Sequence, residues 1–599
     1  MEGGPAMAPG MPQARLRKMR IVAQDPSVRV GGRVLTAEVD VPAEELAPGP
    51  RGYRVHVIDY DTSSGRLVPP AEYGELDPGS NDWARNPAAE VPDSVIAGDP
   101  RFHAQNVYAV VMRTLARFEF ALGRRVSWGF DSPGHQIKVA PHAFADANAF
   151  YSRRDEALLF GYFPSRDGRR NVFTCLSHDV VAHETTHAIL DGLRKRFMEP
   201  SSPDQAAFHE GFADVVALLS VFALPEVVRS LIDLHLGSGG RTDASRPLDP
   251  KDVRRERLAR SVLLGLGKEF GSEMGPIGRS ALRHSAVLPP RDDYLARPEY
   301  QEPHRRGEIL VSAVMNAFLS VWAARLTALV ADRSGQVDRA RAAEEGSSIA
   351  DYLLTMAIRG LDYCPPVHLE FGTFLSAMLT ADREIRPADE KYRFRDNLLE
   401  AFRSFGIQHA SRSTSGKPRR DAEWQRPEVS FSYDRTRFEP MQHDPDEVFR
   451  FVWENRDALR LYEGAYTRVI SVRPCIRLAP EDGFPLRETV AEVLQQLSLT
   501  AGELGKQGVA KPADMPDETE IMLLGGVTLV FDEYGRVKYT IGDGVFDEKR
   551  PAVQKRQTAR IRSLRERGYF RKGASVARRF AAIHRNRSID AITLAKEQW

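Results

Sequence analysis

One pentapeptide combines residue types and a spacing that could bind a metal ion and activate water: His183-Glu184-Thr185-Thr186-His187. On a helix, side chains four residues apart project from the same face, so the two imidazoles can hold one Zn²⁺. Such a site also needs a third protein ligand, and a neighbouring carboxylate, here Glu184, can take a proton from water. Such pentapeptides recur by chance in long chains, and without further ligands a solvated helix face is the commoner explanation.

A second pair of residues supplies what the pentapeptide lacks. Glu210 and Asp214 are also four residues apart, and Glu210 follows His187 by 23 positions. They lie in an apolar, helical sequence, FHEGFADVVALLSVF, where a carboxylate without a partner is costly. This spacing predicts that a second helix delivers Glu210 as the third zinc ligand and Asp214 as the carboxylate that orients a ligating imidazole.

The elements that must position these residues divide the chain into regions of different character. Apolar residues recur at helical spacing over 102–122, strand-like segments follow, and the metal motif lies in the helical pattern 178–194. The sequence predicts an α+β protein organised as a loosely ordered N-terminal segment (1–50), a β-rich amino lobe ending in the motif helix (51–194), a helical carboxy lobe (195–408), a linker (409–430) and a separate C-terminal α+β domain (431–599).

The two candidate helices resemble those of a known family. SHDVVAHETTHAILDGL and HEGFADVVALL are similar to the active-site helices of the thermolysin-like (gluzincin) zinc metallopeptidases. FHAQNVYAVVMRTLARFEFALGR is similar to the family's amino-lobe helix, and FRDNLLEAFRSFGI resembles its closing helix. The likeness covers about residues 50–408 and leaves the C-terminal region unassigned. It implies a two-lobed catalytic unit with a peptide-binding cleft and zinc endopeptidase activity.

The resemblance also implies a role for each matched residue. The implied zinc ligands are His183, His187 and Glu210, with Glu184 as general base and Asp214 as the orienting carboxylate. The remaining matched positions are the electrophilic stabilisers His304 and Arg283, the edge-strand residues Asn148 and Ala149, which would hold the substrate chain, and the pocket residues Val180 and Leu282.

The sequence departs from the family pattern in two places. The family usually has a tyrosine oxyanion donor before the third ligand, but residues 188–209 contain no tyrosine. Loss of one such donor can lower the rate about a hundredfold or more. Asp179 matches a calcium-binding carboxylate of the family, whereas Val221 stands where its partner carboxylate would be, which makes calcium doubtful.

A competing hypothesis is a binding or regulatory protein, whose zinc lobe is catalytically weak and whose C-terminal domain carries the function. The missing tyrosine favours it. The general base Glu184 argues against it, because a structural zinc site needs no base and usually has four closed protein ligands.

The composition places limits on partners. The 599 residues are 42% hydrophobic and 28% charged, with a formal charge of +1, which indicates a soluble globular protein without polyelectrolyte character. The basic stretch 549–587 could contact nucleic acid or an anionic surface, but a solvated helix face explains it better.

Other segments bear on location and redox state. The apolar run 309–331 is broken by polar residues and favours a buried helix over a membrane span. No signal-like segment is visible near the N-terminus, so we expect a cytoplasmic protein or one exported by a non-classical route. The cysteines are Cys175, Cys364 and Cys475, and their spacing predicts buried thiols.

Overall fold

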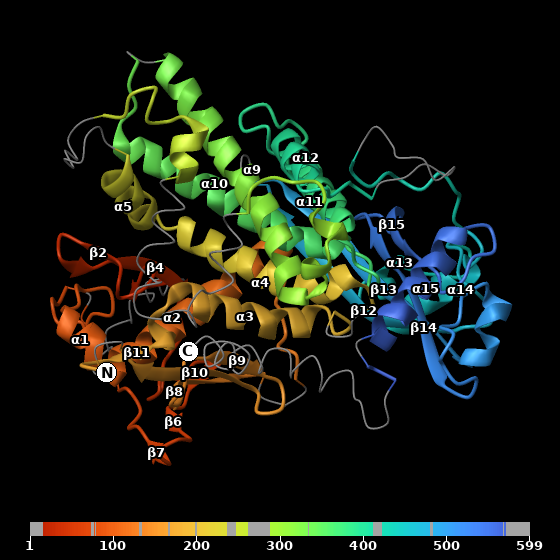
Figure 1. Cartoon of the computed structure of the whole chain (residues 1–599), viewed down its shortest axis with the longest axis horizontal. Coiled ribbons are helices and arrows are strands. Elements are labelled where there is room, and N and C mark those ends of the chain that lie inside the picture. Colours follow the sequence, from red (N-terminus) through yellow and green to blue (C-terminus); the bar gives the residue numbers. More distant parts are fainter. Residues whose placement is uncertain are drawn as a thin grey trace, which may run out of the picture. The chain divides into compact units, whose positions relative to one another are not determined.

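The computed structural model of the chain describes residues 16–72, 77, 79–130, 135–165, 168–197, 201–236, 247–260, 288–332, 335–410, 422–479, 483–566 and 568–570 (Figure 1). Helices and separate sheets are both present, which confirms the predicted α+β class. The chain folds into two compact units. The first unit comprises Met1–Ala116 and Phe130–Thr185, and the second comprises Arg117–Gly129 and Thr186–Trp599.

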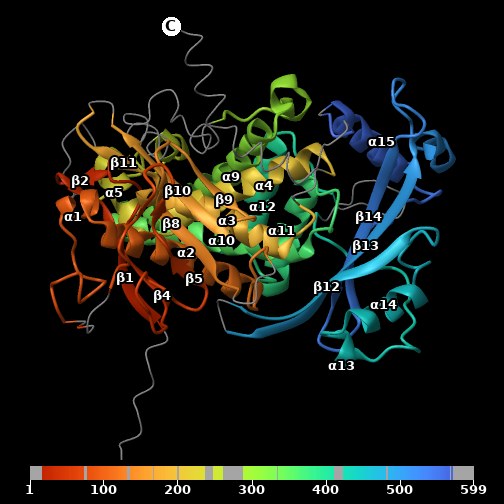
Figure 2. The same cartoon turned by 90° about the horizontal axis from the view of Figure 1, so that it is seen from below.

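The first unit is built on a mixed five-stranded sheet, in which β5, β8 and β10 are parallel and β9 and β11 pair antiparallel with β10 (Figure 2). Its strands are β5 (Val55–Val57), β8 (Ile137–Phe144), β9 (Ala149–Ser152), β10 (Ala157–Pro164) and β11 (Asn171–Phe173). The apolar positions of β8 and β10 are buried, as expected for central strands covered by helices.

The N-terminal segment differs from the sequence expectation. Within 1–50, predicted to be loosely ordered, residues 16–50 are structured: β1 (Leu16–Val22) and β4 (Thr36–Pro42) form an antiparallel ladder with buried apolar side chains. The pairing joins residues up to 26 positions apart, such as Leu16 with Pro42, so local composition does not reveal it. The described part of this unit also contains two short hairpins, β2 (Arg29–Val30) with β3 (Arg33–Val34) and β6 (Tyr60–Asp61) with β7 (Arg66–Leu67).

Among the described residues of the first unit, four helical elements begin. They are α1 (Asp93–Gly98), α2 (Pro100–Leu122), the 3₁₀ turn η1 (Thr174–Leu176) and α3 (His178–Leu193). The predicted apolar stripe of α2 is buried throughout, from Val107 to Phe118. Both α2 and α3 continue into the second unit, α3 after Thr185. The helix with the metal motif is therefore continuous across the boundary between the units.

The second unit starts with a helical region, coloured yellow to green in Figure 1. Its elements are α4 (Pro203–Phe222), α5 (Pro225–His235), η3 (Tyr294–Ala296), η4 (Pro298–Gln301), α9 (Pro303–Asp332), α10 (Arg339–Gly360), η5 (Leu361–Tyr363), α11 (Phe371–Ile385) and α12 (Phe394–Ser404). Among the described residues, α9 alone has the length and apolarity of a membrane-crossing helix, and 78% of its apolar window is buried inside the protein. The buried-helix interpretation accounts for that pattern.

The C-terminal region forms a four-stranded antiparallel sheet in the order β12-β13-β14-β15, whose long strands run side by side in Figure 2. Its elements are α13 (Phe438–Met441), α14 (Pro445–Glu454), β12 (Tyr466–Leu478), β13 (Pro485–Thr500), η6 (Ala501–Gln507), β14 (Glu520–Phe531), β15 (Val537–Asp543) and α15 (Pro551–Glu566). β14 and β15 form a hairpin, with Gly535 at φ 80° in its turn. The start of α14 is capped by the Asp444 side chain, which accepts from the amide of Asp446.

Both faces of this sheet are covered. On one face Val493 and Val527 pack with α14, and Ile521 and Leu523 of the same face pack with Ile561 of α15. On the other face Leu494 and Leu524 contact Val367, which precedes α11. A sheet buried on both faces belongs to the interior of a larger unit.

Ion pairs strengthen the contact between the sheet and the helical region. Residues 195–408 and 431–599 belong to one unit, whereas the sequence analysis expected 431–599 to be a separate domain. The buried guanidinium of Arg477 in β12 bridges Asp362 in η5 and Glu488 in β13. Lys538 of β15 likewise pairs with Glu384 of α11 and, at 2.9 Å, with Glu488. Arg477 and Asp362 are 115 residues apart in the sequence and lie on either side of the predicted linker 409–430, so the sequence alone does not reveal their contact.

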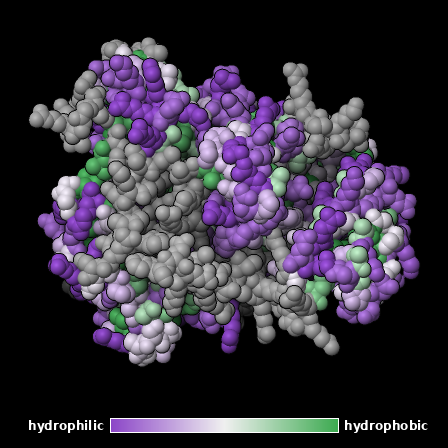
Figure 3. Space-filling model, viewed as in Figure 1, coloured by the Kyte–Doolittle hydropathy of each residue, from purple (hydrophilic) through white to green (hydrophobic). Residues whose placement is uncertain are grey.

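Helix α15 contains the described helical part of the basic stretch 549–587. Val553, Ile561 and Leu564 are buried on its inner face, while Arg550 and Arg556 pair with Asp543. The C-terminal region, at the right of Figure 3, shows a mainly hydrophilic surface with small apolar areas. The described helix is thus an amphipathic part of the domain, and residues 571–587 lie outside the described chain.

Candidate metal centre

The motif helix α3 is buried around most of its circumference. His183, Glu184 and His187 are 3%, 7% and 2% exposed. The 3.6-residue repeat places His183 and His187 on one face of this continuous helix, so their proximity follows from the helix itself. Burial of three titratable side chains in one and a half turns is costly unless they share a partner.

The third predicted ligand comes from α4. This helix starts with a capped first turn, in which the Ser202 hydroxyl accepts from the Gln205 amide at 2.9 Å and Pro203 occupies the first position. Glu210 lies two turns further along and is buried. One ligand atom from each of His183, His187 and Glu210 lies within 4.8 Å of the others. The sequence-predicted ligands are therefore brought together.

A histidine that the sequence analysis missed contacts this cluster. His187 Nδ1 lies 2.7 Å from His209 Nδ1, and the two rings stack with centroids 4.7 Å apart. His187 Nε2 lies 3.9 Å from Glu210 Oε2. One nitrogen of His187 thus faces the ligand cluster while the other is held by His209, an arrangement typical of metal-bound imidazoles. The only sequence signal was the position of His209 directly before Glu210.

The predicted general base is fixed by the edge of the sheet in the first unit. Glu184 Oε2 accepts from the backbone amide of Tyr151 in β9 at 2.9 Å. Among the described strands, β9 pairs with β10 alone, which makes it an edge strand as predicted. A carboxylate at the edge strand lies where a chain added to that edge would run.

The predicted substrate-binding residues of the first unit lie in or beside β9. Ala149 begins β9, and Asn148 precedes it, with its carbonyl accepting from the Gly161 amide and its side-chain oxygen accepting from the Ala149 amide. Val180 lies half-buried in the first turn of α3. Their contacts with a substrate stay a prediction, and Leu282 lies outside the described residues.

His304 lies in the first turn of α9 and close to a predicted ligand. Its Nε2 is 3.7 Å from Glu210 Oε2, and its Nδ1 is 2.6 Å from Glu302 Oε1. Burial alone would raise the pKa of Glu302, but the hydrogen bond from His304 and its charge bring that pKa below the ordinary 4.5. The ionised Glu302 therefore orients His304 with Nε2 toward the candidate centre. Arg283, the other predicted stabiliser, lies outside the described residues.

Asp214 follows Glu210 by one turn of α4 and is buried. Burial, together with the nearby charge of Asp214, raises the pKa of Glu308 to about 7, and Arg305 opposes this from 3.6 Å. The predicted role of Asp214, orienting an imidazole, stays a prediction. For His187, the residue whose ring nitrogen is held from outside the cluster is His209.

Comparison with known proteins assigns no family: no protein-family model matches the chain, and no curated protein matches it. The resemblance to thermolysin-like peptidases therefore depends on the motif residues of this sequence.

The donor set can be tested against zinc on chemical grounds. Catalytic zinc is often held by two imidazoles and one carboxylate, and its fourth position stays open for water or substrate. Structural zinc is usually held by four protein ligands, often thiolates. The buried cluster of His183, His187 and Glu210 offers that three-ligand set, and His209 supplies an outer hydrogen-bond partner. The residues fit zinc.

Proposed function

We propose that the protein is a zinc-dependent endopeptidase. The observation that carries the proposal is the convergence of His183, His187 and Glu210, all buried, with Glu184 next to His183 on the same helix. A buried three-ligand set beside a carboxylate suits hydrolysis more than structural support, because a structural ion needs neither an open position nor a base.

Zinc bound by these three residues would lower the pKa of a water molecule toward neutrality and polarise a substrate carbonyl. Glu184 then accepts the proton of the attacking water and passes it to the leaving amine. The Tyr151 amide holds one oxygen of Glu184, so the carboxylate meets the substrate in a fixed orientation. General-base catalysis of this kind contributes about 10²–10⁴-fold in rate.

His304 takes the role of oxyanion stabiliser. Its Nδ1–H donates to Glu302, which fixes the ring with Nε2 toward the position of the developing negative charge. The family's tyrosine donor has no counterpart in 188–209, so His304 carries this part of the proposal together with Arg283, whose role depends on the resemblance alone.

The proposed substrate is a peptide in extended conformation. Within the described residues β9 pairs with β10 on one side only, which leaves its other side to offer backbone groups to an added strand, and Glu184 lies against β9 through the Tyr151 amide. Strand addition gives affinity through main-chain hydrogen bonds and is largely independent of substrate sequence.

Removal and return of the metal test this function. We expect the purified chain to cut a quenched peptide library, to lose that activity on chelation and to regain it with one equivalent of zinc. His187→Ala should abolish both tight zinc binding at this site and cleavage. Zinc bound at this site without any cleavage would favour the alternative, a catalytically weak zinc protein that acts as a binding module.

A further inference from the structure

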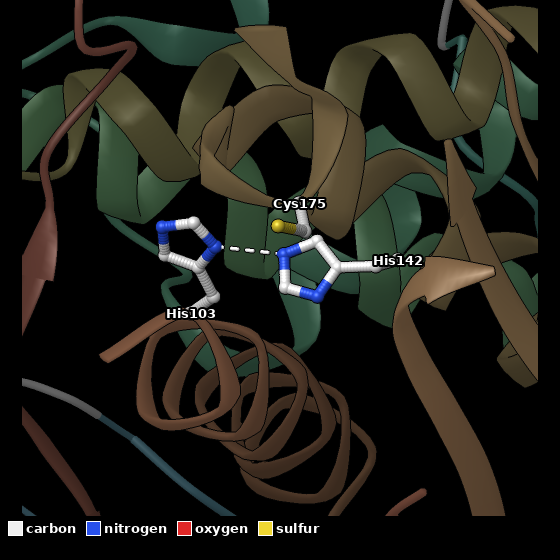
Figure 4. Close-up of side chains that lie close together, drawn as sticks. All are labelled: His103, His142 and Cys175. Carbon is white, nitrogen blue, oxygen red and sulfur yellow. Dashed lines mark hydrogen bonds between the residues drawn. The ribbon is translucent and has the colours of Figure 1, made fainter. Parts of the chain in front are cut away.

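A second set of possible metal ligands lies in the first unit. Figure 4 shows His103 of α2, His142 of β8 and Cys175 of η1 converging side by side. One ligand atom from each lies within 4.8 Å of the others, and all three residues are buried. The endopeptidase mechanism uses none of them.

Hydrogen bonding defines which nitrogen of His103 carries a proton. His103 Nε2 lies 2.9 Å from the carbonyl oxygen of Ile96. A carbonyl oxygen only accepts hydrogen bonds, so Nε2 donates. In the neutral ring the lone pair is then on Nδ1, which points at His142.

The same argument applies to His142. Its Nδ1 lies 2.7 Å from Asp59 Oδ2, and its backbone amide donates to Asp59 Oδ1 at 3.0 Å. Asp59 thus holds His142 by two hydrogen bonds, and Nδ1 carries the proton. In the neutral ring the lone pair of His142 is on Nε2.

These two lone-pair nitrogens, His103 Nδ1 and His142 Nε2, meet at 2.8 Å. Two lone pairs at that distance repel each other unless a proton or a metal ion stands between the rings.

Cys175 favours a metal ion over a proton. Its buried sulfur lies within 4.8 Å of one ring nitrogen of each histidine, and a thiolate with two imidazoles is a ligand set that zinc takes. The rings of His103 and His142 both pack on Phe173, with centroids 4.7 and 5.0 Å away. The outer partners of the imidazoles, a carbonyl and a carboxylate, are those that metal-bound histidines usually have.

We propose that the first unit holds a second zinc ion, bound by His103 Nδ1, His142 Nε2 and Cys175 Sγ, with a water molecule completing the four ligands. Zinc–nitrogen bonds of about 2.0–2.1 Å in tetrahedral geometry keep two nitrogens about 3.3 Å apart. The imidazoles therefore separate by about half an ångström when the ion binds, and the thiol proton is released to solvent.

The position of this site gives it a structural role. The three ligands come from α2, β8 and η1, so the ion ties a helix to the sheet and to the segment before α3. Asn106, one turn after His103, already donates from Nδ2 to the Cys175 carbonyl at 2.9 Å. Only Ser177 separates η1 from α3, and the ion would fix the start of the helix that bears the HExxH motif.

Cobalt substitution tests the proposal independently of peptidase activity. A thiolate ligand gives Co²⁺ a charge-transfer band in the near ultraviolet, and the cluster of His183, His187 and Glu210 contains no thiolate. We expect the cobalt-loaded full chain to show the band. Cys175→Ser should remove it, while His187→Ala, which disrupts the HExxH site, and Cys475→Ser, a matched buried-thiol control, should retain it.

Metal content provides the second measurement. After zinc loading and desalting, we expect about two zinc ions per wild-type chain and about one in His187→Ala, with a lower thermal midpoint when that remaining ion is chelated. A cobalt-loaded wild-type chain without the band would overturn the proposal and leave a shared proton between His103 and His142. The same conclusion would follow if the band persisted in Cys175→Ser. The wild-type spectrum decides the matter even where a variant fails to fold.

Discussion

Gly211 of α4 and Gly307 of α9 lie backbone against backbone. A Cβ atom on Gly211 would stand 2.8 Å from the carbonyl oxygen of Gly307, and one on Gly307 would stand 3.0 Å from the Gly211 amide nitrogen. Only residues without a Cβ allow this approach. The contact lies one residue from Glu210 and three from His304, and it lets His304 Nε2 come within 3.7 Å of the Glu210 carboxylate.

Gly307→Ala should therefore move His304 away from the metal centre without removing a ligand. A displacement of about 1 Å of a catalytic group costs about 10²-fold in rate. We expect kcat/KM for a peptide to fall by about that factor while zinc content stays at the wild-type value. Gly505→Ala, whose added Cβ would meet nothing within 4 Å, is the matched control. Unchanged kcat/KM in Gly307→Ala would show that the glycine contact does not position His304.

His209 should tune zinc affinity. His209→Ala removes the partner of His187 Nδ1, and loss of such an outer partner typically weakens metal binding about 10–100-fold. Competition with a chromogenic chelator measures the change. His209→Asn keeps a hydrogen-bonding side chain and should recover part of the affinity, and His443→Ala, at an exposed loop position, should have none of the effect. Equal zinc affinity in His209→Ala and His443→Ala would contradict the role assigned to His209.

Arg477 should be critical for stability. Replacing it with methionine leaves Asp362 and Glu488 buried without this guanidinium, and breaking a buried pair costs about 3–5 kcal/mol. We expect Arg477→Met to lower the urea midpoint of unfolding strongly. Arg393→Met, which breaks an exposed pair with Asp396, should cost less than about 1 kcal/mol. Similar losses in the two variants would indicate that the buried network is not stabilising.

Ionisation of Asp362 should make the free energy of unfolding depend on pH in the acid range. Burial alone would raise its pKa, but the charge of Arg124 and the hydrogen bonds from it bring the pKa of Asp362 well below the ordinary 3.8. A carboxyl whose pKa is lower in the folded than in the unfolded state stabilises the fold above the unfolded value, and that stabilisation is lost as the pH falls below it. We expect the free energy of unfolding of the wild type to drop on acidification below the ordinary pKa of 3.8, and Asp362→Asn to show a shallower slope and a lower plateau at neutral pH. If the free energy of unfolding followed parallel pH profiles in the wild type and in Asp362→Asn, Asp362 would not be the source of the pH dependence.

The sequence predicted features whose signal is local. His183, Glu184 and His187 lie within one and a half turns of the same helix. Glu210 could be anticipated because a carboxylate in an apolar helix needs a partner.

Long-range contacts were beyond such inference. Arg477 meets Asp362 across 115 positions, and His103 meets His142 across 39, with nothing in either local pattern to single out the partner. The ladder between β1 and β4 has the same origin. Each depends on tertiary packing, which overrides weak local preference.

Glu184→Gln tests the central claim most directly, because it keeps the shape of the side chain and removes only its basicity. Zinc content and cleavage of a quenched peptide library are measured on the same preparations of wild type and variant. The account predicts equal zinc content and a loss of at least about 10²-fold in kcat for the variant. A Glu184→Gln chain that binds zinc and cuts peptides at the wild-type rate would contradict the assignment of Glu184 as the general base of a zinc endopeptidase.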